Sequence, residues 1–255
     1  MARHAKVQEL AKMIDHSLLH PTMTTTALIK GCKIAREYDV ASVCIKPYAI
    51  PLAVEQLRGS DVLVGTVIGF PQGNSTIAVK VAETIQACME GAVEIDMVVN
   101  IGKVLEEDWD YVTKEIKSVC KATHNHKAIL KVIFENDYLS DDTHKVKLCE
   151  ICSELGVDFV KTSTGYGFNK GADGKYSYKG ATHEDLILMR KHVADEVQVK
   201  AAGGVRTLDD LLAVQNLGVT RIGATATIAI LEAAMERFGD GSNKNVVIES
   251  SPSDY

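Results

Sequence analysis

Four charged residues interrupt apolar segments of this sequence, and together they have the makings of a reactive site. Lys131 lies in "AILKVIFE" (128–135), Lys161 in "DFVKTST" (158–164) and Lys200 in "VQVKAAG" (197–203), while Asp96 lies in "EIDMVVN" (94–100). Burying a charge without a partner costs several kcal/mol. If these segments are buried strands, the charged side chains must therefore meet and pair.

The ratio of lysines to carboxylates in these segments indicates a nucleophilic lysine. Asp15, Lys46, Glu94 and Glu135 interrupt apolar segments in the same way. We count three lysines against one or two carboxylates, and an excess of positive charge in a confined space lowers the pKa of at least one lysine. A lysine that is neutral near pH 7 attacks carbonyl groups and forms Schiff bases. The alternative is an ion network that only stabilises the fold.

The fold class follows from the order of elements along the chain. Eight apolar segments of strand length alternate with helical patterns, and they span 13–19, 42–47, 63–70, 94–100, 128–135, 158–164, 197–203 and 220–225. The clearest helical patterns span 24–38, 75–91, 140–156, 207–218 and 226–239, with Ser75 and Thr207 as expected N-caps. Strict alternation predicts parallel strands joined by right-handed crossovers.

Eight such units predict an α/β protein with a (β/α)8 TIM barrel. An open doubly wound sheet is the alternative, but the first strand is not followed by a glycine-rich dinucleotide turn. We expect a single domain over 1–255, with a polar tail from about 240 to 255. A barrel would also bring the charged side chains of non-adjacent strands together in its lumen.

Two glycine-containing segments indicate a phosphate site. "AAGGVRT" (201–207) and "IGATAT" (222–227) follow the seventh and eighth expected strands, where barrels of this class often bind phosphate at helix N-termini. The alternative is that these glycines only make tight turns. The long segment 166–181 lies beside this position, as a lid or as a neutral insertion.

Composition argues against several other classes of protein. With 28 Lys and Arg against 34 Asp and Glu, the net charge of -6 argues against a nucleic-acid partner. No stretch approaches the ~20 apolar residues of a membrane span, and the N-terminus lacks the apolar core of a signal peptide. We therefore expect a cytoplasmic protein. We interpret its six cysteines as buried free thiols, with Cys149 and Cys152 packed in a helix and no second pair to complete a metal site.

Several segments resemble the deoxyribose-phosphate aldolase family. "VKTSTG", "VKAAGGVRT" and "EIDMVVN" match its signature strands, and "LKVIFE", "SVCIKP" and "MIDHSLL" fit in the same order, so the resemblance spans about residues 10 to 240. It implies a metal-independent lyase without a cofactor that works in deoxyribonucleoside catabolism. Such an enzyme reversibly cleaves the sugar phosphate 2-deoxy-D-ribose 5-phosphate to acetaldehyde and D-glyceraldehyde 3-phosphate.

The resemblance also implies roles for individual residues. Lys161 would form the Schiff base, Lys200 would tune its pKa and transfer protons, and Asp96 would relay protons. The supporting lumen residues would be Asp15, Cys44, Lys131 and Thr162. The substrate and its phosphate would be bound by Gly165, Gly203, Gly204, Val205, Arg206, Gly223 and Thr225. A homodimer is the expected assembly.

The sequence departs from some relatives, and other functions compete. Tyr166 stands where some relatives have a lysine, and Ala226 where some have a serine, which bears on phosphate affinity. The terminal Tyr255 reaches the site in some relatives, and a tail without such a role is the alternative. Another Schiff-base aldolase, a pyridoxal-phosphate enzyme and a sugar-phosphate sensor without catalysis are the competing functions.

Overall fold

The eight expected strands form a closed parallel barrel. The computed structural model describes residues 4–171 and 173–239, and its barrel order is β1-β10-β9-β6-β5-β4-β3-β2. The strands are β1 (Ile14–Leu18), β2 (Ser42–Ile45), β3 (Leu63–Ile68), β4 (Glu94–Val98), β5 (Ile129–Ile133), β6 (Phe159–Lys161), β9 (Gln198–Ala202) and β10 (Arg221–Ala224). The predicted (β/α)8 barrel is confirmed. The single-domain prediction for 1–255 is untested, because the expected tail at 240–255 lies outside the described residues.

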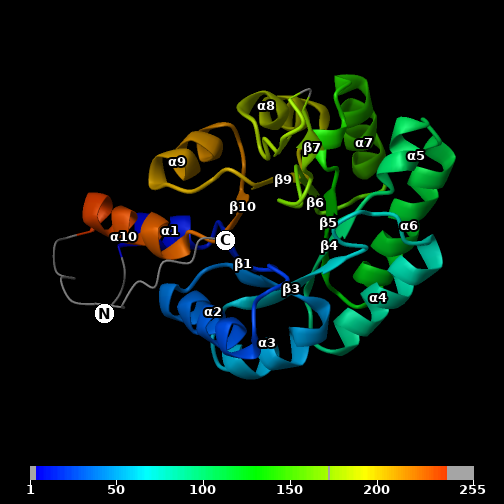
Figure 1. Cartoon of the computed structure of the whole chain (residues 1–255). Coiled ribbons are helices and arrows are strands. Elements are labelled where there is room, and N and C mark those ends of the chain that lie inside the picture. Colours follow the sequence, from blue (N-terminus) through cyan, green and yellow to red (C-terminus); the bar gives the residue numbers. More distant parts are fainter. Residues whose placement is uncertain (1–3, 172, 240–255) are drawn as a thin grey trace.

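Helices surround the barrel on its outer side (Figure 1). They are α1 (Ala5–Ala11), α2 (Thr25–Tyr38), α3 (Ile50–Leu57), α4 (Ile77–Met89), α5 (Ile101–Leu105), α6 (Trp109–Asn125), α7 (Asp142–Glu154), α8 (His183–His192), α9 (Leu208–Asn216) and α10 (Thr227–Phe238). Two short 3-10 turns, Pro47–Ala49 and Asn136–Tyr138, follow β2 and β5. One apolar core fills the space between strands and helices, which is how a barrel of this kind buries the outer faces of its strands.

Two predicted helix starts had different outcomes. Thr207 caps α9 as expected, in a capping box with Asp210. The prediction of Ser75 as the cap of α4 was wrong, because Thr76 occupies that position and its hydroxyl accepts a hydrogen bond from the Val79 N–H. Both residues carry a hydroxyl, so the sequence pattern did not distinguish the two registers.

The register of the barrel places the charged residues beside one another. Asp96 pairs with Lys131 between β4 and β5, and Lys161 pairs with Lys200 between β6 and β9. Side chains at alternate positions of a strand share one face, and in a barrel that face is the lumen. The parallel register therefore brings charged residues from four strands together.

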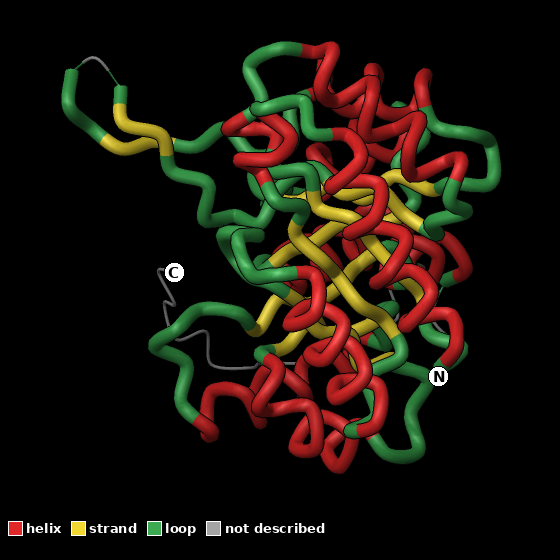
Figure 2. The backbone as a smooth tube through the Cα atoms, turned by 90° about the vertical axis from the view of Figure 1, so that its right-hand side faces the viewer, coloured by secondary structure: helices red, strands yellow, loops and turns green. Residues whose placement is uncertain are grey.

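The segment between β6 and α8 contains a small hairpin that leaves the barrel. Strands β7 (Asn169–Lys170) and β8 (Tyr176–Ser177) pair antiparallel, and Figure 2 shows them projecting away from the helices and strands. The base of the hairpin returns along β9, where the Ala181 N–H donates to the Gly203 carbonyl at 3.0 Å. The hairpin itself thus extends outward, while its base lies against the loop after β9.

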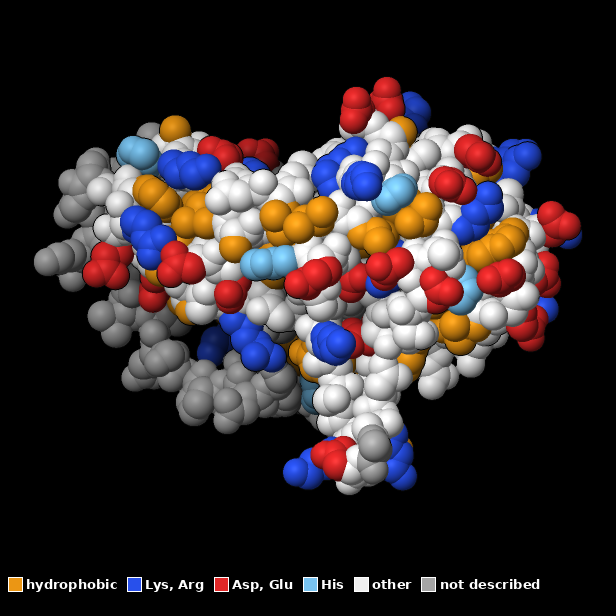
Figure 3. Space-filling view, turned by 90° about the horizontal axis from the view of Figure 1, so that it is seen from above, with side chains coloured by type: hydrophobic (Ala, Val, Ile, Leu, Met, Phe, Trp, Pro, Cys, Tyr) orange, Lys and Arg blue, Asp and Glu red, His pale blue; other side chains and the backbone are white. Residues whose placement is uncertain are grey.

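The next observations concern the cysteines, metal ligands, membrane spans and surface charge. All six cysteines are free, and Cys149 and Cys152 are buried in α7. Within 4–171 and 173–239, no group of three or more His, Cys, Asp or Glu side chains is placed to hold a metal ion. No helix in these ranges is long and apolar enough to cross a membrane. Acidic and basic side chains are interspersed over the face in Figure 3.

A second buried ion pair, outside the barrel lumen, joins α4 to α6. The Lys80 ammonium donates to a Glu115 carboxylate oxygen at 2.8 Å, and both side chains are fully buried. Lys80 also donates to the carbonyls of Gly73 and Val98, while Glu115 accepts from the Asn100 N–H. The pair therefore holds the loop after β3 against the end of β4.

Removing one member of this pair should destabilise the fold. We expect Lys80→Met to lower the free energy of unfolding by about 3 kcal/mol, because Glu115 would remain buried without its ammonium partner. Urea denaturation of both proteins measures the difference. Lys147→Met, which breaks the exposed Lys147–Glu150 pair of α7, is the control and should leave the denaturation midpoint unchanged. Equal midpoints for all three proteins would contradict this account of the buried pair.

Candidate active site

The Asp96 carboxylate lies at the centre of the charged residues in the lumen. Its Oδ2 accepts hydrogen bonds from the Lys161 and Lys200 ammonium groups, each at 2.7 Å, and its Oδ1 accepts from Lys131 at 2.9 Å. All four side chains are almost fully buried. The lumen therefore brings Asp96 together with the three lysines that interrupt apolar segments of the sequence.

A second group of charges lies nearer the N-terminal ends of the strands. Arg221 Nη1 donates to Asp15 Oδ1 at 2.5 Å and to Glu94 Oε1 at 3.0 Å. Lys131 donates to Glu94 at 2.6 Å, and Lys200 donates to Asp15 at 2.5 Å. Arg221 and Glu94 are the first residues of β10 and β4. Lys161, in contrast, is the last residue of β6, so it lies closest to the C-terminal mouth of the barrel.

The predicted charge count was therefore wrong. Instead of three lysines against one or two carboxylates, the described lumen holds four cations, Lys131, Lys161, Lys200 and Arg221, against three carboxylates, Asp15, Glu94 and Asp96. Arg221 was not among the lumen residues predicted from the sequence. A signal was present, because a charge at 221 alternates with Gly223 in an otherwise apolar strand. Cations still outnumber carboxylates in the lumen, but by four to three and not by three to one or two.

The pKa of Lys161 is shifted downwards. Burial lowers it, the Asp96 carboxylate opposes that effect, and the neighbouring Lys200 ammonium lowers it further, so the pKa of Lys161 lies below the ordinary value for lysine. A larger fraction of Lys161 is thus neutral at a given pH than of a solvent-exposed lysine. This is the property that a nucleophilic amine needs.

The other two lysines have the opposite shift. Burial disfavours the charged form of Lys200, but Asp15 and Asp96 outweigh it and raise its pKa. Asp96 and Glu94 likewise raise the pKa of Lys131 against the effect of burial. Lys131 forms ion pairs with three carboxylates and Lys200 with two, whereas Lys161 forms one. Of the three, Lys161 alone is thus placed to lose its proton.

Three residues expected among the lumen charges or supporting groups are placed elsewhere. Lys46 follows β2 and donates to the carbonyls of His20 and Met23. Glu135 follows β5 and accepts from Thr164. The Thr162 hydroxyl bridges to the main chain of Ala202 in β9, because it alternates with Lys161 and so lies on the other face of the strand. None of them contacts the ion network.

Cys44, by contrast, lies beside the lysines and links them to an apolar cluster. Burial and the Asp96 carboxylate raise the pKa of its thiol to about 11, so it is a neutral group there. Cys44 packs with Leu19 and Val67, and Phe70 and Tyr166 cover this cluster. An apolar surface therefore extends from the lysines towards the mouth.

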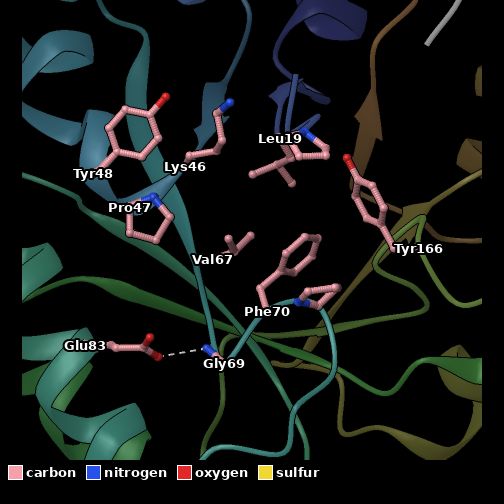
Figure 4. A pocket seen from close by; sticks show the side chains of 11 residues that line it. Leu19, Lys46, Pro47, Tyr48, Val67, Gly69, Phe70, Glu83 and Tyr166 are labelled. Atoms are coloured by element: carbon pink, nitrogen blue, oxygen red, sulfur yellow. Dashed lines mark hydrogen bonds between the residues drawn. The ribbon is translucent and has the colours of Figure 1, made fainter. Parts of the chain in front are cut away.

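A pocket of about 360 Å³ opens at the mouth over this surface. Figure 4 shows Phe70 and Tyr166 on neighbouring walls, with Leu19, Lys46 and Tyr48 on the other sides. The rings of Phe70 and Tyr166 meet edge to face with centroids 5.6 Å apart. Sequence patterns did not identify this pocket, because its walls come from the ends of β1, β2 and β3 and from the loop after β6.

The residues expected to bind phosphate lie in β10 and in the loops that follow β6, β9 and β10. Gly165, Gly203 and Gly204 have φ values of 86°, 81° and 91°, in the left-handed region that favours glycine. Gly223 lies beside the Lys200 side chain, where a Cβ would come within 3.6 Å of Lys200 Cε. Thr225 is exposed.

Val205 and Arg206, which follow Gly203 and Gly204 in the loop after β9, differ in exposure. Val205 is buried, while Arg206 is exposed and its N–H donates to Asp210. The loop thus presents main-chain groups and one exposed guanidinium. A phosphate site here stays a prediction, since this geometry suits an anion without identifying one.

Comparison with known proteins identifies the family. The sequence model for DeoC/LacD family aldolases matches residues 10–232. The chain belongs to the DeoC/LacD aldolase family. It is 51% identical to deoxyribose-phosphate aldolase of Rhodopirellula baltica, over 91% of each chain, and 50% identical to that of Clostridium perfringens, over 88% of this chain and 95% of the other.

A solved structure extends the likeness of this family member to three dimensions. The tetrameric deoxyribose-phosphate aldolase of Aeropyrum pernix superposes with a TM-score of 0.80 and 26% sequence identity, covering 92% of this chain and 94% of the other. The resemblance inferred from the signature strands is therefore confirmed at the level of the family. The fold of this chain is therefore shared with a deoxyribose-phosphate aldolase of known structure.

The depressed pKa of Asp96 predicts how stability depends on pH. Lys131, Lys161 and Lys200 outweigh burial and hold the pKa of Asp96 well below its usual range. Its contribution to stability is therefore complete above about pH 4, the pKa in the unfolded chain, and is lost as the pH falls towards the folded-state pKa. We expect the free energy of unfolding of Asp96→Asn to fall less steeply between pH 4 and pH 2 than that of the wild type.

Urea denaturation at a series of pH values measures this difference in slope. The exposed Asp61→Asn serves as the control and should keep the wild-type slope. Parallel curves for wild type and Asp96→Asn would show that Asp96 does not hold its low pKa in the folded protein.

Proposed function

We propose that this chain is a deoxyribose-phosphate aldolase that works through a Schiff base on Lys161. The observation that carries the proposal is the sorting of the three lumen lysines, in which Lys161 alone has a lowered pKa and lies at the mouth. The substrate is assigned by likeness to relatives about 50% identical that bear this name. Barrel enzymes place their reacting groups at the C-terminal ends of strands, where Lys161 lies.

The reaction begins with neutral Lys161 as the nucleophile. Its amine attacks the C1 aldehyde of open-chain 2-deoxy-D-ribose 5-phosphate, and loss of water gives an iminium ion. The C3 hydroxyl then gives up its proton and the C2–C3 bond breaks, which releases glyceraldehyde 3-phosphate. The bonding electrons pass to the iminium, so the two-carbon fragment remains on Lys161 as an enamine. Protonation at C2 and hydrolysis by water release acetaldehyde and restore the amine.

Lys200 and Asp96 are proposed to manage the protons of this sequence. Lys200 donates to Asp96 Oδ2, and the same oxygen accepts from Lys161. When Lys161 loses its proton before it attacks the aldehyde, Lys200 stays protonated because its pKa is raised. Lys200 thus keeps the Asp96 carboxylate paired and remains a proton donor close to the reacting amine.

The phosphate of the substrate is proposed to lie at the loops after β9 and β10. Gly203 and Gly204 are left-handed there, which frees main-chain N–H groups to face an anion. The residues expected to bind it are Gly165, Val205, Arg206, Gly223 and Thr225 together with this pair. The location of the enzyme in the cytoplasm, and the contribution of Tyr255 to the site, stay predictions from the sequence; Tyr255 lies outside the described residues.

Replacing Lys161 should abolish cleavage and leave the fold intact. We expect Lys161→Leu to lower kcat at least a thousandfold, because no other amine of the lumen has a lowered pKa. Release of acetaldehyde from 2-deoxy-D-ribose 5-phosphate measures the activity. Borohydride reduction of the wild type with acetaldehyde should leave a two-carbon adduct on the peptide that contains Lys161, identified by mass spectrometry.

The same assays separate the competing functions. Binding of the sugar phosphate without turnover would indicate a sensor, and an absorbance band above 400 nm in the purified protein would indicate pyridoxal phosphate. Turnover of a different sugar phosphate alone would indicate another Schiff-base aldolase. Activity in Lys161→Leu close to that of the wild type would refute the role of Lys161 in any of these reactions.

We also propose that the chain forms a homodimer through the outer face of α3 and α4. Val54, Ile85, Met89 and Val93 are exposed apolar side chains on these helices and the loop after α4, with Met89 73% exposed. A Cβ at Gly91 would touch Val54, so the loop after α4 adjoins α3. Apolar patches of this kind often mark interfaces. Sedimentation equilibrium should give twice the chain mass of 27.7 kDa, and Met89→Glu should shift the protein to monomer. A monomeric wild type would contradict the proposal.

A further inference from the structure

Glu135 is a buried carboxyl group at the mouth that the proposed reaction does not use. It lies two residues beyond the end of β5, is 1% exposed, and has a φ of 59°, in the left-handed region that non-glycine residues rarely adopt. Burying a carboxyl group and holding this backbone conformation both cost free energy. The surrounding structure must therefore hold Glu135 in place through specific contacts.

Those contacts all lie in the segment that follows Lys161. Glu135 Oε2 accepts from the Thr164 N–H at 3.2 Å and from the Thr164 hydroxyl. The Thr164 oxygen in turn accepts from the Tyr166 N–H at 2.9 Å. Gly167 packs on the carboxyl group so closely that a Cβ there would lie 2.7 Å from Glu135 Cδ. One carboxyl group thus fixes the turn that spans 164–167.

The segment 161–167, which contains this turn, contacts two parts of the site. Before the turn, the main chain on either side of Glu135 holds the strand of Lys161: the Phe134 N–H donates to the Lys161 carbonyl at 3.0 Å, and the Asn136 N–H donates to the Thr162 carbonyl at 2.9 Å. Within the turn, Tyr166 forms the pocket wall against Phe70 (Figure 4).

We propose that Glu135 is a positioning residue for the reaction. Through Thr164 it holds the turn after β6, so that Lys161 keeps its place beside Asp96 and Tyr166 keeps its place against Phe70. It touches neither the reacting amine nor the pocket, and it acts through Thr164. The inference rests on the proposed function, because its effect is read from Lys161 chemistry.

The test is a double-mutant cycle between Glu135 and Thr164. Glu135→Gln preserves the shape of the side chain but replaces one acceptor oxygen by a donor, and Thr164→Val removes the hydroxyl at nearly constant volume. Each change breaks the same contact, so their effects should not add. We expect each single variant to lower kcat/KM about tenfold, and the double variant to lower it about tenfold as well.

Two further variants separate positioning from general destabilisation. Thr164→Ser keeps the hydroxyl and should stay within about twofold of wild-type activity. Thr123→Val removes a hydroxyl of a fully buried threonine in α6, where it donates to the Val119 carbonyl, and should leave activity unchanged. The rate of borohydride trapping of acetaldehyde on Lys161 should fall with kcat/KM in the Glu135 and Thr164→Val variants, at temperatures where circular dichroism shows all of them folded.

Each outcome decides between the alternatives. A double variant about a hundredfold less active than the wild type would show independent effects and overturn the coupling. Equal loss in Thr164→Ser and Thr164→Val, or wild-type activity in both Glu135→Gln and Thr164→Val, would overturn it too. If the wild type itself neither cleaves the sugar phosphate nor traps acetaldehyde on Lys161, the proposed function fails, and with it the role assigned to Glu135.

Discussion

A single carboxylate oxygen, Asp96 Oδ2, holds two ammonium groups at 2.7 Å each, and the site depends on this contact. The two lysines lie 65 and 104 residues further along the chain. Closure of the barrel is what brings them to one atom. A buried cluster of charges is stable only if every member is paired, so the barrel register and the ion network each require the other.

Within this network, depth along the barrel axis sorts the lysines. Arg221 and Glu94 begin their strands, and Arg221 pairs with Glu94 and Asp15. Glu94 is a partner of Lys131 and Asp15 is a partner of Lys200, in addition to the Asp96 carboxylate that both lysines contact. Lys161 ends its strand beyond the reach of Asp15 and Glu94, and Asp96 is its only carboxylate partner among the described residues. Chemically identical side chains therefore acquire opposite pKa shifts. The difference arises from the number of carboxylates within reach of each lysine, and the Lys200 ammonium beside Lys161 adds to it.

The sequence predicted the barrel and the convergence of its charges, because both follow from local patterns. Alternation of apolar and charged residues identifies which side chains share the lumen face. It gives no depth, and contacts across the lumen depend on depth and on the stagger of the strands. The separate partners of Lys161, Lys131 and Lys200 were therefore not predictable from the pattern. Lys46 and Glu135 were assigned to the lumen wrongly because each lies just beyond the last residue of its strand, where alternation no longer holds.

The mouth of the barrel differs between its two halves, and the difference fits the proposed reaction. On the β1–β3 side, Leu19, Val67 and Phe70 form an apolar wall that reaches Cys44 beside the lysines. On the β9–β10 side, Gly203 and Gly204 expose main chain. An apolar wall keeps water from the enamine and favours the neutral amine, whereas exposed main chain suits an anion. A substrate with a carbonyl at one end and a phosphate at the other would therefore match the two kinds of surface that the mouth offers.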